Sequence, residues 1–339
     1  SPDGTRLAFA NTTDAGIELW VADVRTARAR RVLGPVLNAI LGAPFHWAPD
    51  GRALFAKTVL PGRGAPPEAP RAPAAPIILE STGRAAPSHT FAHLLAGPHD
   101  EQLFEHYFTA RLVRVGADGG RATPIGEPGI LAEFSIAPGG DWILLTRVTR
   151  PYSYLAPVSA FGRETVILDA RGRQVHTVEH RDEIVTAPIG RGAAPRGPRA
   201  VQWRADAPAT LAWVEAVDTG NVRDRVLMLD APFDGAPRTL IQLEQRYSGL
   251  EWGRTDLAFV HAYDAHAGRT RTWLVDPSRP DAPPRLLEDR SADDRYADPG
   301  RPVTHAGAAA EHAVLHLAPD GSAIYLTGNG ASPRGDHPF

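Results

Sequence analysis

Hydrophobic and polar positions alternate along most of this chain, in short runs that follow one kind of tight turn. The turn is Pro-Asp-Gly, and the run after it is rich in β-branched and aromatic residues. Proline presets the backbone, aspartate accepts hydrogen bonds from it, and glycine takes the left-handed conformation. Period-two alternation after such a turn predicts a half-buried β-strand. The repeat occurs at SPDGTRLAF (Ser1–Phe9), APDGRALFA (Ala48–Ala56), APGGDWILL (Ala137–Leu145) and APDGSAIYL (Ala318–Leu326).

Two further stretches, Ala205–Val214 and Gly253–Val260, keep the strand but lose the full turn. Six copies at intervals of roughly 45 to 90 residues predict an all-β repeat fold, a β-propeller. About six blades are legible. The chain is expected to begin and end within a blade, so that residues 1–339 would be an incomplete propeller domain with seven or eight blades in its complete form. Because each blade packs against its neighbours, such a domain can exceed the usual size of a single core.

The strand pattern is interrupted over residues 61–108. Pro61–Pro87 carries seven prolines, which cannot join a sheet interior and favour an extended, polyproline-like backbone. This segment is interpreted either as a surface insertion or as an arm or lid across a propeller face. From Thr90 to Phe108 the apolar period approaches 3.6, which predicts two short helices separated by Pro98.

Composition narrows the possible functions. A net charge of −3 lacks the basic face expected of a nucleic-acid-binding protein. The chain has no cysteine, hence no disulfide or thiolate site, and no apolar run long enough for a membrane-spanning helix. Lys57 is the sole lysine among 36 lysines and arginines, which suggests a GC-rich bacterial gene. The compartment stays open between periplasm and cytoplasm.

Sequence motifs for catalysis are missing. There is no Gly-x-Ser-x-Gly, no phosphate-binding glycine motif and no His-Glu-x-x-His. His89 and His93 have helical spacing, but no third ligand is indicated, so no metal site is expected. Asp293 and Asp294 could form a carboxylate dyad, although a solvated acidic loop is the preferred interpretation. No cofactor is expected.

Arginines next to aromatic residues are the one recurring feature that suggests binding. They occur at Arg150 with Tyr152, Arg246 with Tyr247, Arg271 with Trp273, and Arg295 with Tyr296. A guanidinium stacks on aromatic rings and also presents a rigid donor fork to a carboxylate. These groups are therefore either structural stacks or, where they converge, a receptor for an acidic side chain or a peptide terminus.

Several long segments, in this order, resemble the propeller part of glutamyl endopeptidase, a branch of the prolyl-oligopeptidase serine peptidases. They are LNAILGAPFHWAPDGRALFA, TFAHLLAGPHDEQLFEHYFTARL, RPYSYLAPVSAFG, VQWRADAPATLAWVEAVDTG, RYSGLEW, RTRTWLVDP, LEDRSADDRYADPG and GNGASPRGDHPF. Together they extend over most of the chain.

The resemblance implies a two-domain serine peptidase whose α/β-hydrolase domain follows Phe339 and carries the catalytic triad. No catalytic residue is therefore assigned to this chain. The propeller would admit peptide substrates and exclude folded proteins, with cleavage after glutamate. The substrate-binding candidates are Arg150, Tyr152, Arg246 and Arg271. The alternative is a stand-alone propeller that binds protein partners and has no enzymatic activity.

Overall fold

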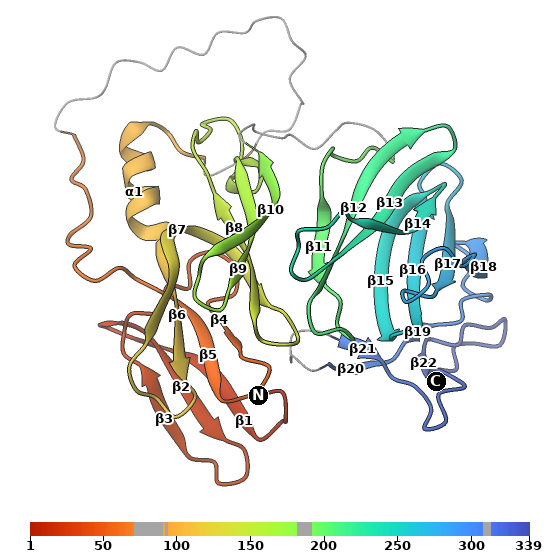
Figure 1. The fold of residues 1–339 in the computed structure, drawn as a ribbon, viewed down its shortest axis with the longest axis horizontal. Coiled ribbons are helices and arrows are strands. Elements are labelled where there is room, and N and C mark those ends of the chain that lie inside the picture. Colours follow the sequence, from red (N-terminus) through yellow and green to blue (C-terminus); the bar gives the residue numbers. More distant parts are fainter. Residues whose placement is uncertain (71–90, 92–93, 182–191, 308–312) are drawn as a thin grey trace, which may run out of the picture. The chain divides into compact units, whose positions relative to one another are not determined.

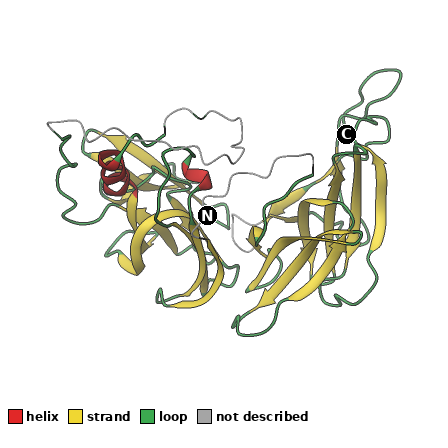
Figure 2. Ribbon diagram, turned by 90° about the horizontal axis from the view of Figure 1, so that it is seen from above, coloured by secondary structure: helices red, strands yellow, loops and turns green. Residues whose placement is uncertain are grey.

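The computed structural model describes residues 1–70, 91, 94–181, 192–307 and 313–339. These residues form mainly β-strands, with one α-helix and one short 3-10 helix (Figure 2). The chain divides into two compact units. Unit 1 consists of Ser1, Asp3–Ser135 and Trp142–Ile189, and unit 2 of Pro2, Ile136–Asp141 and Gly190–Phe339.

Unit 1 holds two antiparallel sheets in which strands follow one another in chain order (Figure 1). The smaller sheet contains β1 (Arg6–Thr13), β2 (Gly16–Asp23) and β3 (Ala29–Leu33). The larger contains β4 (Phe45–Trp47), β5 (Ala53–Thr58), β6 (Thr109–Gly116), β7 (Thr123–Ile136), β8 (Trp142–Val148), β9 (Arg163–Asp169) and β10 (Gln174–Arg181). Strand β7 is long enough to serve two four-strand meanders, because β6 pairs with it as far as Ile130 and β8 borders its other edge.

Unit 2 repeats the meander. One sheet holds β11 (Arg199–Trp203), β12 (Thr210–Thr219), β13 (Val222–Asp230) and β14 (Arg238–Leu243). The next holds β15 (Arg246–Arg254), β16 (Leu257–Asp264), β17 (Arg269–Val275) and β18 (Arg285–Ser291), extended beyond β15 by β21 (Ala313–Leu315) and β20 (Thr304–Ala306). A small ladder joins β19 (Arg301–Pro302) to β22 (Leu326–Thr327).

The Pro-Asp-Gly turns close as their residue types predict. Gly51 has a φ of 66° and donates its N–H to the Ala48 carbonyl, while Asp50 accepts the N–H of Arg52. Gly321 repeats this geometry with a φ of 69°. Only glycine adopts this left-handed backbone without steric cost, so each turn sets the start of the strand that follows.

The cores lie between neighbouring sheets of the same unit. In unit 2, Val214 and Met228 are at most 1% exposed and belong to one cluster with Trp252 and Val260 of the next sheet. In unit 1, Leu19 of the small sheet packs in one cluster with Leu54 of the large one. Burying each such side chain stabilises the fold by about 1.5–3 kcal/mol, so the meanders stabilise one another face to face, as propeller blades do.

The described part of the interruption contains a single helix, α1 (Pro98–Phe108), and the 3-10 helix η1 (Val158–Ala160) lies further along the chain. The predicted helix before Pro98 does not form at the described residues 91 and 94–97, and residues 90, 92 and 93 lie outside the described part. Pro98 does not separate two helices but begins α1, in the first turn, where a missing N–H breaks no intrahelical hydrogen bond. Residues 71–90 of the proline-rich segment lie outside the described part. No helix among the described residues is long and apolar enough to cross a membrane.

The fold class predicted from the repeat, an all-β propeller with a small helical insertion, is confirmed. By chain order the described strands form six groups, namely β1–β3, β4–β7, β7–β10, β11–β14, β15–β18 and β19–β22.

Candidate functional site

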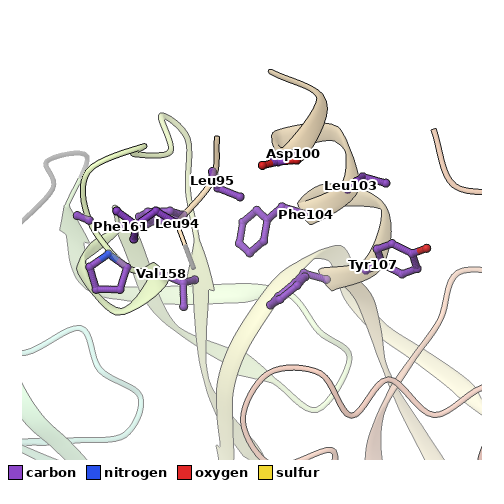
Figure 3. Close-up of a pocket in the computed structure, with 11 residues that line it drawn as sticks. Leu94, Leu95, Asp100, Leu103, Phe104, Tyr107, Val158 and Phe161 are labelled. Carbon is purple, nitrogen blue, oxygen red and sulfur yellow. The ribbon is translucent and has the colours of Figure 1, made fainter. Parts of the chain in front are cut away.

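An open apolar pocket of about 470 Å³ lies in unit 1 between α1 and the segment that contains η1 (Figure 3). The labelled side chains in the view come from both elements and from the chain just before the helix. The lining residues are Leu94, Leu95, Asp100, Leu103, Phe104, Tyr107, Phe108, Ala156, Pro157, Val158 and Phe161. A concave apolar site with few polar groups is the usual form of a ligand pocket.

Contacts made by acidic residues in the first turn of α1 fix the start of the helix. The backbone N–H of Ala96 donates to Asp100, with 2.7 Å between nitrogen and oxygen, and Glu101 follows within the same turn. Carboxylates there offset the positive end of the helix dipole. Phe104 then faces inward and is 7% exposed.

Phe104 is the centre of an aromatic cluster that forms the pocket floor. Its ring centroid lies 4.4 Å from that of Phe108, 5.0 Å from Tyr152 and 5.9 Å from Phe161. The contacts with Tyr152 and Phe161 are edge-to-face, which is the favoured geometry for such pairs. The cluster holds α1 against the strands of the large sheet.

Of the predicted site residues, Tyr152 belongs to this cluster and Arg150 lies against its ring. The Arg150 guanidinium lies 4.9 Å from the Tyr152 ring centroid, and its Nε donates to Glu105 across 2.7 Å. Its Nη1 donates to Glu101 across 3.1 Å. The Tyr152 hydroxyl also donates to Glu105, and the Tyr154 hydroxyl donates to Glu101. Two ion pairs of Arg150 thus fasten the helix to the loop after β8.

These contacts shift the acidities of the group. The hydrogen bond from Arg150 lowers the pKa of Glu105, and the same bond raises the pKa of Arg150. Burial, followed by the bond to Glu105, raises the pKa of Tyr152. Arg150 and Glu105 therefore stay charged, and Tyr152 stays a donor, throughout the neutral range.

Arg246 lines a separate polar cavity of about 210 Å³ in unit 2. Its side chain is 17% exposed and contacts Asp218 across 2.7 Å and Asp224 across 2.8 Å. Asp224 is fully buried and also pairs with Arg199 and with the backbone N–H of Tyr247. Most donors of Arg246 are thus directed at the protein itself.

Arg271 lies next to the same cavity. Its Nη1 is 3.1 Å from Oε2 of Glu244, which lines the cavity. Its Nε donates to Asp289 across 3.0 Å. The structure therefore brings the predicted residues together in two pairs, Arg150 with Tyr152 in unit 1 and Arg246 with Arg271 in unit 2.

Other candidates take structural positions or lie outside the described residues, as His89 and His93 do. Asp294 accepts the backbone N–H groups of Tyr296 and Ala297, as expected of a turn rather than of a dyad. No cluster of three potential metal ligands occurs within the described ranges.

Sequence reasoning did not single out two features of this region. It placed Phe104 within the segment of helical period, Thr90–Phe108, but it gave no means of finding Phe161 across the pocket. It also passed over Arg163 and Arg181, which the register of β9 and β10 places opposite each other. Arg181 has no Phe, Tyr or Trp within two residues in the sequence, so this signal could not find it. Arg163 follows Phe161 by two residues, the same spacing as in Arg150 with Tyr152, so its signal was present and was passed over.

No family model matches the sequence. Two curated plant proteins match all of it, each at 33% identity: the probable chloroplastic glutamyl endopeptidases of Oryza sativa subsp. japonica and Arabidopsis thaliana. The resemblance to glutamyl endopeptidases inferred from the sequence segments is confirmed by these matches. It spans 38% and 37% of the lengths of these relatives. Both are plant proteins, so they do not support the bacterial source suggested by the composition.

Solved structures similar to this chain include the acylaminoacyl peptidase of Pyrococcus horikoshii, at 14% identity and a TM-score of 0.43, covering 85% of this chain and 37% of that one. Another is the β-propeller domain of the trilobed protease of Pyrococcus furiosus, at 8% identity and a TM-score of 0.42, covering 80% of this chain and 66% of that one.

Proposed function

We propose that this chain is the non-catalytic propeller of a serine peptidase of the prolyl-oligopeptidase type, and that it controls the access of peptides to a separate catalytic domain. The observation that carries the proposal is the full-length match to glutamyl endopeptidases of which the chain spans little more than a third. The 339 residues hold no Gly-x-Ser-x-Gly, so the nucleophile would belong to an α/β-hydrolase domain encoded after Phe339.

The apolar pocket and its charged flank would form part of the wall that a peptide meets. Aromatic rings supply area for an apolar side chain, and Arg150 is 55% exposed, with its Nη2 engaged by no described residue. Such a donor suits a glutamyl carboxylate. Arg246 and Arg271 would frame a second, polar contact, at the cavity where their bonds hold Glu244 and Asp224 in place.

The test is to express the polypeptide encoded by the whole gene beside the 339-residue chain. A fluorophosphonate probe should label the longer protein and leave this chain unlabelled. The longer protein should cleave short peptides after glutamate. It should not cleave folded proteins that contain the same residues around a glutamate. Labelling of this chain, or a stop codon directly after Phe339, would overturn the proposal and favour an interaction module without enzymatic activity.

A further inference from the structure

Two arginines face each other on neighbouring strands of unit 1. Arg163 of β9 and Arg181 of β10 are direct partners in the ladder. Opposed residues of an antiparallel pair have their side chains on the same face, with Cβ atoms about 4.5–5.5 Å apart. Like charges in this position destabilise the sheet, so the arrangement calls for an anion between them.

The described residues supply little of that compensation. No hydrogen bond joins either guanidinium to a described residue, and the Nε of each is buried without a partner. Among the described residues, the one carboxylate within 4 Å of either guanidinium is that of Glu179, whose Oε1 is 3.9 Å from Nη1 of Arg181, beyond hydrogen-bonding range. The side chains of Arg181 and Glu179 are 23% and 15% exposed, so water satisfies these groups only partly.

On the opposite face of the same strands, a carboxylate lies between the basic side chains. There Glu164 lies between Arg147, at 3.6 Å, and His180, at 3.8 Å. On the face of Arg163 and Arg181, two positive groups share one carboxylate. Burial raises the pKa of Glu179, although Arg181 and Arg163 act to lower it.

The apolar pocket begins on this same face. Val148 is the ladder partner of Arg163 on the side of β8, and it is buried in one cluster with Phe104 and Phe161. Phe161 lines the pocket and precedes Arg163 by two residues. A chain segment with an apolar side chain in the pocket could therefore present a neighbouring acidic side chain to the arginines.

We propose that Arg163 and Arg181 form a carboxylate-binding site that receives an acidic side chain of a peptide. Guanidinium groups bind carboxylates through paired, charge-assisted hydrogen bonds. The carboxylate would use donors that are otherwise unpaired and would relieve the repulsion between the two arginines. The inference rests on the proposed peptide-binding function and names an acidic peptide as the ligand, at residues distinct from Arg150, Arg246 and Arg271.

The test compares two capped peptides, acetyl-Ala-Phe-Glu-Ala-amide and its glutamine counterpart, by calorimetric titration of the 339-residue chain at low salt. The glutamate peptide should bind roughly tenfold or more tightly than the glutamine peptide. Arg163→Gln and Arg181→Gln should each remove this preference and leave the glutamine peptide unchanged. Arg173→Gln is the control, because Arg173 is 79% exposed at the turn of the same blade.

A second measurement does not depend on peptide binding, and its titration uses the wild-type chain alone. Titration of the wild-type chain with glutarate, followed by the NMR signals of arginine Nε–H groups, should move two signals that are lost in the Arg163→Gln and Arg181→Gln proteins. Equal binding of both peptides, or phosphate displacing glutarate at lower concentration, would overturn the carboxylate site. Failure of both peptides to bind while glutarate still shifts these signals would instead contradict the peptide-binding function.

Discussion

Arg150 and Tyr152 share one carboxylate: the Nε of Arg150 and the hydroxyl of Tyr152 both donate to Oε1 of Glu105, across 2.7 and 2.9 Å. The guanidinium also stacks over the ring. Glu105 lies on α1, while the two donors lie on the loop after β8. The position of the helix, and with it the shape of the apolar pocket, therefore depends on this contact.

Removing the hydroxyl should loosen this contact without changing the ring. Tyr152→Phe is expected to lower the free energy of unfolding by about 1 kcal/mol, because one half-buried hydrogen bond is lost. Urea unfolding gives the measurement. The matched control is Tyr296→Phe, whose ring is 66% exposed and whose change should lie within about 0.5 kcal/mol.

Among the pocket residues, Phe104 should contribute most to the stability of the fold. Phe104→Ala removes a ring that is 7% exposed and contacts three aromatic neighbours, so the free energy of unfolding should fall by about 3–5 kcal/mol. Leu155→Ala, at a side chain 63% exposed beside the pocket, should leave stability nearly unchanged. Equal thermal midpoints for the two variants would show that the aromatic cluster does not hold the helix.

Substitution of Arg246 should lower the free energy of unfolding more than substitution of Arg271, although the sequence selected both arginines by the same signal. Arg246→Ala leaves Asp224, which is fully buried, with Arg199 as its remaining charged partner among the described residues, and should cost about 3 kcal/mol. Arg271→Ala should cost about 1 kcal/mol, because its partners Glu244 and Asp289 are 65% and 27% exposed and neither is left as a fully buried charge. Denaturant midpoints of the two variants decide the order, and the reverse order would assign the structural role to Arg271.

Lys57 should make stability depend on pH. It is 1% exposed, and it donates to the carbonyls of Leu41 and Leu131. Burial lowers its pKa to about 8 from 10.5, an effect that Glu133 opposes. Below pH 8 the lysine is protonated in both folded and unfolded chains. Between pH 8 and 10.5 only the unfolded chain keeps the proton, so stability should rise across this window.

The rise has an upper bound of about 3 kcal/mol. Unfolding of the wild type and of Lys57→Arg should be compared at each pH, because arginine stays charged throughout. The difference between the two proteins, rather than either curve alone, removes the contribution of tyrosines. A difference that is constant from pH 7 to 11 would show that Lys57 keeps an ordinary pKa in the fold.

The repeat and its turns could be predicted from the sequence because both are local. Gly51 and Gly321 need a left-handed backbone, and the strands after them need alternating side chains, whatever surrounds them. The long match to glutamyl endopeptidases likewise follows from residues in order. The role of Pro98 was misjudged because proline is compatible both with the gap between helices and with the first turn of one.

Contacts between distant segments were decided only by the tertiary structure. An arginine beside an aromatic residue in sequence does not show which carboxylate it will meet, and Glu105 is 45 residues from Arg150. Arg163 and Arg181 oppose each other because the ladder between β9 and β10 sets that register, with two irregularities along its length. A shift of one residue would turn their side chains to the other face, and no local pattern in the sequence specifies that register.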